Sequence, residues 1–196
     1  YMQLVQMLRR QGYEVVREKT TMTDEKRVWT FQKDEVTLRL AHDEEIPRHP
    51  SQMTRSIPYY TLFNNRPDSR LDVWVDGQLC GVLVIDFKYR NPDYIWSDHI
   101  LETTGEVPST MQQLEAYASN IRTDFHYLNL PSNPLVEMRP VSEVWVIYPR
   151  KYDKKERDIQ KNAYGIRLLD MSPALDYSYL ETLLQMIIEK IKKRKQ

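Results

Sequence analysis

The sequence predicts an α/β fold in which a central mixed β-sheet is flanked by helices. Helix and strand patterns follow one another in the order helix, three strands, long loop, two strands, helix, two strands, helix. The run Val82-Leu83-Val84-Ile85 is apolar on both faces, which is typical of the buried centre of a sheet. Hydrophobic residues make up 41% of the 196 residues and charged residues 29%, so we expect residues 1–196 to form a single domain.

The N-terminal part of the chain is predicted to hold a helix and three strands. Leu4, Val5 and Leu8 are spaced for one face of a helix. This helix is predicted over residues 2–10, because Gly12 then provides a stop. The strands are predicted at residues 13–17, 27–31 and 36–40, with a hairpin turn at residues 32–35.

A long polar loop is predicted over residues 42–65, because three prolines interrupt any regular pattern there. A loop of this length in a compact domain is often functional. His42 and His49 lie in it, but their spacing matches no metal-site pattern. We therefore expect both histidines to be solvated.

The rest of the chain alternates strands and helices. Asp76-Gly77 is a turn signal, so the strands on either side of it should form a hairpin. Ser109 is expected to cap the following helix. The predicted elements are strands at residues 71–76 and 81–89, irregular chain at 91–108, a helix at 109–121 with Met111, Leu114, Ala118 and Ile121 on one face, a strand at 141–148, a charged stretch at 150–161, a strand at 162–169 and a helix at 174–193.

Composition limits the functions open to the chain. Cys80, beside Gly81 at an expected turn, is the only cysteine, so an internal disulfide is excluded. No apolar run approaches the ~18–20 residues that cross a membrane, and no signal peptide opens the chain, so we expect a cytoplasmic protein. Because Tyr1 already lies in a helical pattern, we expect a fragment of a longer protein.

The charge balance argues against a free-standing nucleic-acid binder of high affinity. The chain has 28 Lys and Arg residues and 28 Asp and Glu residues, a net charge of zero, whereas such binders are usually basic. The neutral charge does not exclude an enzyme that binds DNA through other domains or through a partner. The basic C-terminal end, Lys190 to Lys195, is interpreted as a solvated helix terminus.

The strongest chemical signal is Asp86-Phe87-Lys88 at the end of the most apolar strand. An acid and a lysine two residues apart on a strand point to the same face. Burying both is unfavourable unless they pair or bind a partner such as a divalent cation. Two other Asp-x-Lys patterns, Asp24-Glu25-Lys26 and Asp153-Lys154-Lys155, lie in polar stretches where exposed charges need no explanation.

A second acid precedes this signal on the neighbouring strand. If Gly77 turns a hairpin, we expect Asp72 to lie level with Asp86, so that both carboxylates share one Mg²⁺ ion. The Pro67-Asp68 dipeptide offers Asp68 as an alternative ligand. Asp72 is preferred, because the alternating strand pattern begins there.

The order of these motifs along the chain resembles that of the PD-(D/E)XK nuclease superfamily. Asp72 and then Asp86-Phe87-Lys88 are similar to its motifs II and III, and Gln113 and Tyr117 match the Gln-x-x-x-Tyr helix of its RecB-type members. With the strand that ends at Tyr148-Pro149, the order is most similar to the nuclease subunit of McrBC-type and LlaJI-like restriction systems. The match runs from about Arg70 to Asp170.

The resemblance implies a restriction-endonuclease-like core and a catalytic centre. It implies that Asp72, Asp86, Lys88, Gln113 and Tyr117 are catalytic, and that Asp72, Asp86 and Phe87 bind Mg²⁺, with Mn²⁺ as a substitute. The implied activity is hydrolysis of DNA phosphodiester bonds in a prokaryotic restriction or defence system. A separate NTP-hydrolysing motor subunit is an implied partner, because this chain has no phosphate-binding loop of its own. A homodimer is a further expectation, since double-strand cutting needs two centres.

Departures from the family leave two other interpretations open. Leu71 stands where the family has a proline before its acid, and the first predicted helix carries no acidic residue. A catalytically inactive nuclease-fold module that docks or binds nucleic acid is the main alternative. The simplest alternative is an α/β domain with incidental charges at its strand ends.

Overall fold

The computed structural model describes residues 1–20, 27–63, 66–90, 92–96, 103, 105, 107–149, 158–161, 163, 165–171 and 177–195. Its larger sheet contains β1 (Glu14–Thr20), β2 (Arg27–Lys33), β3 (Val36–His42), β5 (Ser69–Val75), β6 (Gln78–Phe87), β8 (Val141–Tyr148), β9 (Asp158–Lys161) and β10 (Ile166–Asp170). Two short strands, β4 (Tyr59–Tyr60) and β7 (Arg122–Thr123), form a separate sheet. The helices include α1 (Met2–Arg10), α2 (Pro92–Ile95), α4 (Ser109–Ser119), α5 (Pro134–Met138) and α6 (Ser178–Lys192), with 3₁₀ turns η1 (Pro50–Gln52), η2 (His126–Leu128) and η4 (Lys193–Lys195).

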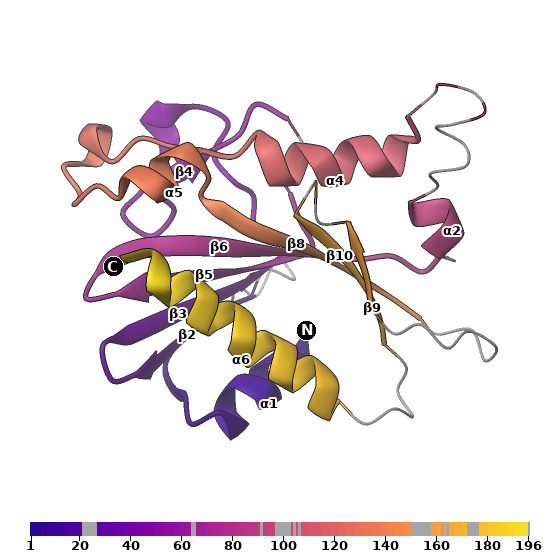
Figure 1. Ribbon diagram of the computed structural model, residues 1–196. Helices are drawn as coiled ribbons and strands as arrows, with labels where there is room; N and C mark the ends of the chain where they lie inside the picture. Colours follow the sequence, from indigo (N-terminus) through magenta and orange to yellow (C-terminus); the bar gives the residue numbers. More distant parts are fainter. Residues whose placement is uncertain are drawn as a thin grey trace.

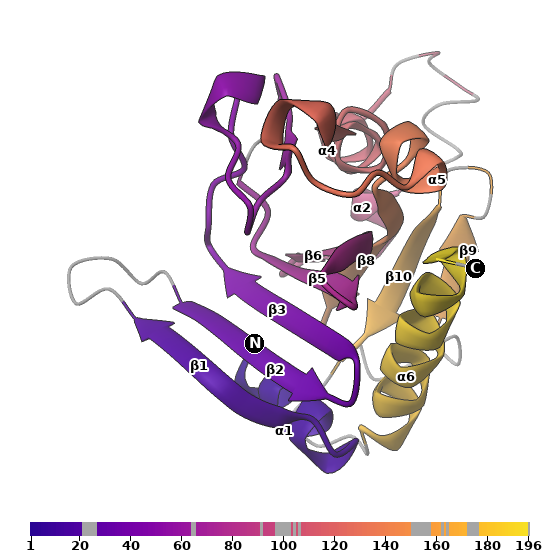
Figure 2. The same ribbon diagram turned by 90° about the vertical axis from the view of Figure 1, so that its left-hand side faces the viewer.

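The larger sheet has the strand order β1-β2-β3-β5-β6-β8-β10-β9. Strands β1 to β6 in this order are antiparallel neighbours, whereas β8 runs parallel to both β6 and β10. Helix α4 lies on one side of the sheet and helices α1 and α6 lie on the other (Figures 1 and 2). The predicted α/β class, a mixed central sheet flanked by helices, is therefore confirmed.

Two hydrophobic cores fill the spaces on either side of the sheet. Alternate residues of β5, β6 and β8 pack against α1 and α6, as Leu83, Ile85 and Trp145 do. The residues between them, such as Val84 and Val146, pack against α4. Because both faces are covered, the run from Val82 to Ile85 is buried and apolar on both faces, as the sequence predicts.

Several predicted elements are confirmed, and others differ in their ends. The helix at residues 2–10 and the strand at residues 141–148 have the predicted bounds. The strand predicted at 162–169 is observed as β10 and begins at Ile166, and the helix predicted at 174–193 is observed as α6 from Ser178. The sequence did not predict α2, α5 or β9. Residues 24–26 and 153–155, with the other two Asp-x-Lys patterns, lie outside the described residues.

Three local interpretations are wrong. Pro108, rather than Ser109, is the N-cap of α4, and it makes no side-chain capping bond. Cys80 is a fully buried residue of β6 rather than part of a turn, because the turn ends earlier, at Gly77. His42 is the half-buried last residue of β3 rather than a solvated loop residue. In the part of the chain that the structure describes, no helix combines the length and apolar character needed to cross a membrane.

Candidate active site

The β5–β6 hairpin brings two carboxylates together at its open end. The turn residues Asp76 and Gly77 have φ angles of 49° and 74°, the left-handed geometry of a two-residue hairpin turn. Ser69 pairs with Ile85, so the next residues outward, Asp68 and Asp86, lie level with each other. The Phe87 N–H donates to Asp68 Oδ2 over 2.6 Å. Asp68 is thus fixed at the end of β6, next to Asp86.

The prediction that Asp72 lies level with Asp86 is wrong. It assumed a hairpin centred near residue 79, whereas the turn lies at Asp76-Gly77. Asp72 instead pairs with Val82, four residues from Asp86 and about 13 Å along the strand at about 3.3 Å per residue. The alternative acid of the Pro67-Asp68 dipeptide occupies the expected place.

Lys88, Gln113 and Tyr117 form a continuous chain of contacts beside Asp86. Lys88 Nζ lies 2.8 Å from Asp86 Oδ2 and donates to Gln113 Oε1 over 3.0 Å. Gln113 Nε2 donates to the Tyr117 hydroxyl over 3.2 Å, one helical turn further along α4. The Tyr117 hydroxyl donates to the Arg66 carbonyl, 3.3 Å away. The structure therefore brings together four of the five predicted catalytic side chains, from the end of β6, the residue that follows it and α4.

Backbone contacts fix the end of β6 on both sides. The Lys88 N–H donates to the Ile147 carbonyl of β8 over 2.9 Å, and Phe87 N–H holds Asp68. The Phe87 side chain packs against the core on the α1 and α6 side, so only its backbone faces the carboxylates. Lys88 is thereby held next to Asp86 while its side chain remains partly open to solvent.

Asp86 is a buried carboxylate with incomplete compensation. Only 2% of its surface is exposed, and among the described residues the close partner of its Oδ2 is the Lys88 ammonium, 2.8 Å away. Burial raises the pKa of Asp86 to about 6. Lys88 opposes this shift, and the negative charge of Asp68 adds to it. Burial and the charge of Asp86 also raise the pKa of Tyr117, so its hydroxyl remains a donor at neutral pH.

Asp86→Asn is expected to stabilise the metal-free fold. The folded-state pKa of Asp86 lies above its ordinary value of 3.8, so stability falls as pH rises between about 4 and 6 and stays lower above that range. About two pKa units correspond to about 3 kcal/mol, and we expect the variant to gain about 2–3 kcal/mol at pH 8. Urea unfolding in EDTA at pH 4 and pH 8 measures this gain. The exposed Glu45→Gln is the control, and an unchanged or lower stability of Asp86→Asn at pH 8 would contradict the assignment.

Asp72 belongs to a separate buried cluster of charges. The Tyr59 hydroxyl donates to Asp72 Oδ1 over 2.6 Å, and Arg39 Nη1 donates to Oδ2 over 3.2 Å. Arg70 Nε lies 3.7 Å from Oδ1, and both arginines bind Glu44. Two guanidiniums and two carboxylates balance in this cluster. Asp72 has a structural partner on each oxygen, and two cations beside it disfavour a metal ion.

Two residues that sequence reasoning missed hold Asp68 in place. Its carbonyl accepts hydrogen bonds from the Asp43 N–H over 2.9 Å and from His42 Nδ1 over 2.8 Å. Because a carbonyl only accepts, Nδ1 of His42 carries the proton. The alternation of residues 36–40 ends at Leu40, because Ala41 is apolar and His42 is polar where the reverse order would continue it. No pattern in the sequence therefore places His42 on the strand.

The donor set at this site is small but suits Mg²⁺. Among the described residues, no group of three or more His, Cys, Asp or Glu side chains lies around a possible metal position. Asp68 and Asp86 supply two carboxylates, and Mg²⁺ usually takes only one or two from a protein. Oδ2 of Asp86 is a buried oxygen that has the Lys88 ammonium as its close partner, and a metal ion would add to this incomplete compensation of its charge.

Comparison with family models, curated proteins and solved structures finds no match to this chain. The geometry of the site is therefore the basis on which a function is assigned.

Proposed function

We propose that this chain is a divalent-metal-dependent nuclease that hydrolyses DNA phosphodiester bonds, with Asp68, Asp86 and Lys88 as its centre. One observation carries the proposal: two carboxylates lie level at the open end of a hairpin, and the buried one, Asp86, is paired with a lysine that is partly open to solvent. A buried site of this kind is unfavourable for stability and is explained by function. Asp68 takes the role for which the sequence favoured Asp72.

Asp68 and Asp86 would hold the metal ion, with Mg²⁺ as the natural ion and Mn²⁺ as a substitute. When bound, the metal would polarise a phosphate oxygen and favour ionisation of water. The backbone carbonyl of Phe87, between Asp86 and Lys88, would be a further ligand of the ion. A cation here would also lower the pKa of Asp86 again, because it stabilises the ionised carboxylate.

The protein side chains have separate roles in the proposed reaction. The Lys88 ammonium stabilises negative charge on the phosphate or orients the attacking water. Gln113 Oε1 accepts a hydrogen bond from Lys88 and fixes the direction of the ammonium. Tyr117 anchors Gln113 in turn and links it to the Arg66 carbonyl, two residues before Asp68. Gln113 and Tyr117 are thus positioning residues for Lys88 in this proposal.

Two further parts of the proposal are the type of fold and the biological system in which the chain acts. A sheet in which the antiparallel β5–β6 hairpin continues into the parallel β8 and β10, with α4 over the site, supports a restriction-endonuclease-like core. We propose on the sequence resemblance that the chain acts in a restriction or defence system with an NTP-hydrolysing motor partner and cuts as a homodimer. These points depend on the resemblance, and fold alone does not fix them.

Cleavage of supercoiled plasmid DNA tests the proposed function. We expect cutting in Mg²⁺ or Mn²⁺ that EDTA stops, and we expect Lys88→Ala to lower the rate by about 10²- to 10³-fold, because the charge near the phosphate is lost. Gln113→Ala should lower it less, since it removes only a contact to Lys88. Lys192→Ala, which removes a lysine paired with Glu189 on α6, is the control and should cut as the unmodified chain does.

Calorimetric titration with Mn²⁺ separates an active enzyme from an inactive nuclease-fold module. An active site should bind the ion, and binding should be lost in Asp86→Ala. A chain that binds no Mn²⁺ and leaves DNA intact would support the inactive module. Cleavage that is unchanged in both Lys88→Ala and Asp86→Ala would refute the proposed centre.

A further inference from the structure

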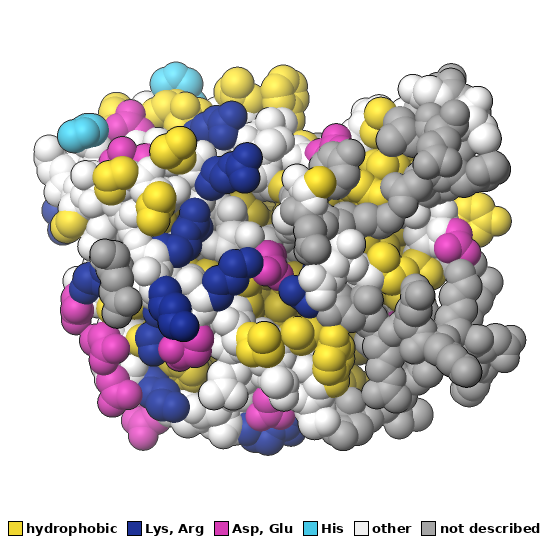
Figure 3. Space-filling model, in the orientation of Figure 1, with side chains coloured by type: hydrophobic (Ala, Val, Ile, Leu, Met, Phe, Trp, Pro, Cys, Tyr) yellow, Lys and Arg dark blue, Asp and Glu magenta, His cyan; other side chains and the backbone are white. Residues whose placement is uncertain are grey.

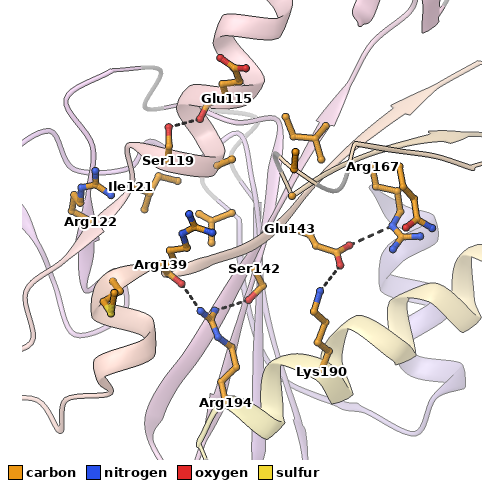
Figure 4. A pocket seen from close by; sticks show the side chains of 17 residues that line it. Glu115, Ser119, Ile121, Arg122, Arg139, Ser142, Glu143, Arg167, Lys190 and Arg194 are labelled. Carbon is orange, nitrogen blue, oxygen red and sulfur yellow. Dashed lines mark hydrogen bonds and ion pairs between the residues drawn. The ribbon is translucent and has the colours of Figure 1, made fainter. Parts of the chain in front are cut away.

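A second site lies at the other end of the parallel strands. A groove of about 780 Å³ is lined by α4, the start of β8, the start of β10 and the C-terminal end of α6 with η4. Arg122, Arg139 and Arg194 line it from three separate parts of the chain, and Figure 4 shows Arg139 and Arg194 near its centre and Arg122 at its edge. Glu143 at the groove is about 10 Å along β8 from Val146, the partner of Asp86, at about 3.3 Å per residue. The groove is thus separate from the candidate active site.

The three arginines have no carboxylate partner within the described part of the chain. Arg194 donates to the Ser142 hydroxyl over 2.8 Å and to the carbonyls of Arg139 and Leu135 over 2.8 and 3.3 Å, which are all neutral acceptors. The exposed guanidiniums of Arg122 and Arg139 make no hydrogen bond or ion pair with any described residue. Burial lowers the pKa of Arg194, and the charge of Arg139 lowers it further.

The acids of the groove leave these charges uncompensated. Glu143 is already bound by Lys190 over 2.8 Å and by Arg167 over 3.4 Å. Glu115 is the other acid of the lining, and its carboxylate lies beyond ion-pair distance of the arginines. With Arg122, Arg139, Arg167, Lys190 and Arg194 against two acids, the lining carries a net charge of +3 in a chain whose total is zero.

The positive charge extends beyond the groove. Figure 3 shows lysines and arginines in a band that runs down this face of the molecule. The C-terminal turn Lys193–Lys195 follows α6 directly, and Arg194 from this turn lines the groove. From the sequence, this end is expected to be a solvated helix terminus. The Arg194 side chain instead donates to the Ser142 hydroxyl at the groove. An extended band of cations is better matched to an extended polyanion than to a small anion.

We propose that this groove binds the sugar–phosphate backbone of a nucleic acid, with Arg122 and Arg139 as the residues that contact its phosphates. Arginine forks match phosphate oxygens, and the two side chains are free to reorient toward them. The proposal deepens the proposed nuclease function by naming a second contact for its substrate, and it depends on that function only for the identity of the nucleic acid. A groove of this kind would also allow a chain of zero net charge to bind DNA, because its positive charge is concentrated at one site.

Fluorescence anisotropy with a labelled 20-base-pair duplex tests the proposal. The binding protein carries Asp86→Asn, so that no cleavage is needed or possible, and the buffer contains EDTA. In this background we expect Arg122→Gln with Arg139→Gln to weaken binding about tenfold or more and to reduce the slope of log Kd against log salt by about two, one for each arginine. The control pair is Arg9→Gln with Arg27→Gln, two exposed arginines on α1 and β2 that remove the same charge far from the groove.

The outcomes separate this proposal from the proposed function. If the groove pair loses affinity and salt slope while the control pair does not, the groove is a nucleic-acid contact, whether or not the unmodified chain cuts DNA. Equal losses in both pairs, or no loss in either, would overturn it. If adenosine monophosphate binds at the groove in an arginine-dependent way and the duplex does not, the groove serves a small phosphate compound and the proposal is wrong. In a chain that cuts, the groove pair should raise KM and leave kcat unchanged.

Discussion

Asp68→Asn is expected to reduce metal-dependent DNA cleavage on the order of 10³-fold and to abolish Mn²⁺ binding, while the fold stays intact. The substitution removes one of two carboxylates but keeps an oxygen that accepts the hydrogen bond from Phe87 N–H. Initial rates on plasmid DNA and calorimetric titration with Mn²⁺ measure the two effects. Thermal unfolding of the variant in EDTA should stay within about 2 °C of the unmodified chain.

Asp72→Asn is the matched variant, because it makes the same chemical change four residues away on the same face. At a temperature where both variants are folded, Asp72→Asn should still bind Mn²⁺ and cut DNA. The opposite pattern, with activity kept in Asp68→Asn and lost in folded Asp72→Asn, would show that Asp72 is the ligand. The hairpin register would then be a poor guide to the site.

Asp72→Ala is expected to lower the free energy of unfolding by about 3–5 kcal/mol. Asp72 is fully buried, and its loss leaves Arg39 and the almost fully buried Arg70 with a net positive charge and the Tyr59 hydroxyl without an acceptor. A change of this size lowers the melting temperature of a chain of this length by about 6–20 °C. Urea unfolding followed by circular dichroism measures it.

Tyr59→Phe provides the comparison for this cluster. It removes the hydrogen bond to Asp72 but leaves all four charges in place, so the expected loss is about 1–2 kcal/mol. A loss below 1 kcal/mol in Asp72→Ala would contradict the role assigned to the cluster. The pair of experiments separates the cost of an unmatched buried charge from that of one hydrogen bond.

Much of the fold could be predicted because it is recorded in local patterns. The helix at residues 2–10 follows from one apolar face, and the turn at Asp76-Gly77 follows from residues that accept positive φ. The spacing of Gln113 and Tyr117 predicts that both face one way on a helix, and their hydrogen bond agrees. Elements without such patterns were missed: the four residues of α2 and the five of α5 are too short for helical periodicity to be visible.

The error at Asp72 shows where local patterns stop being sufficient. To predict which residues of a hairpin lie opposite each other, the position of the turn must be known to within one residue. The register of the β5–β6 pair also shifts between Val73 and Trp74, which a count from the turn does not include. The strand pattern favoured Asp72 because it lies inside β5, whereas Asp68 lies just before it. The alternation of apolar and polar residues shows which face of the sheet a residue occupies, but it does not show which residue of the neighbouring strand lies opposite.

The sequence by itself determined the α/β class, the buried strand that ends in Asp86 and Lys88, and the helix that carries Gln113 and Tyr117, because each depends on periodicity within one segment. Only the tertiary structure decided which acid faces Asp86. It places Asp68 there through the hairpin register and commits Asp72 to Arg39, Tyr59 and Arg70, residues 2 to 33 positions away. The groove of Arg122, Arg139 and Arg194 likewise depends on segments that meet only in the folded chain. Charges act through space, so their partners follow from folded distances and not from their order along the chain.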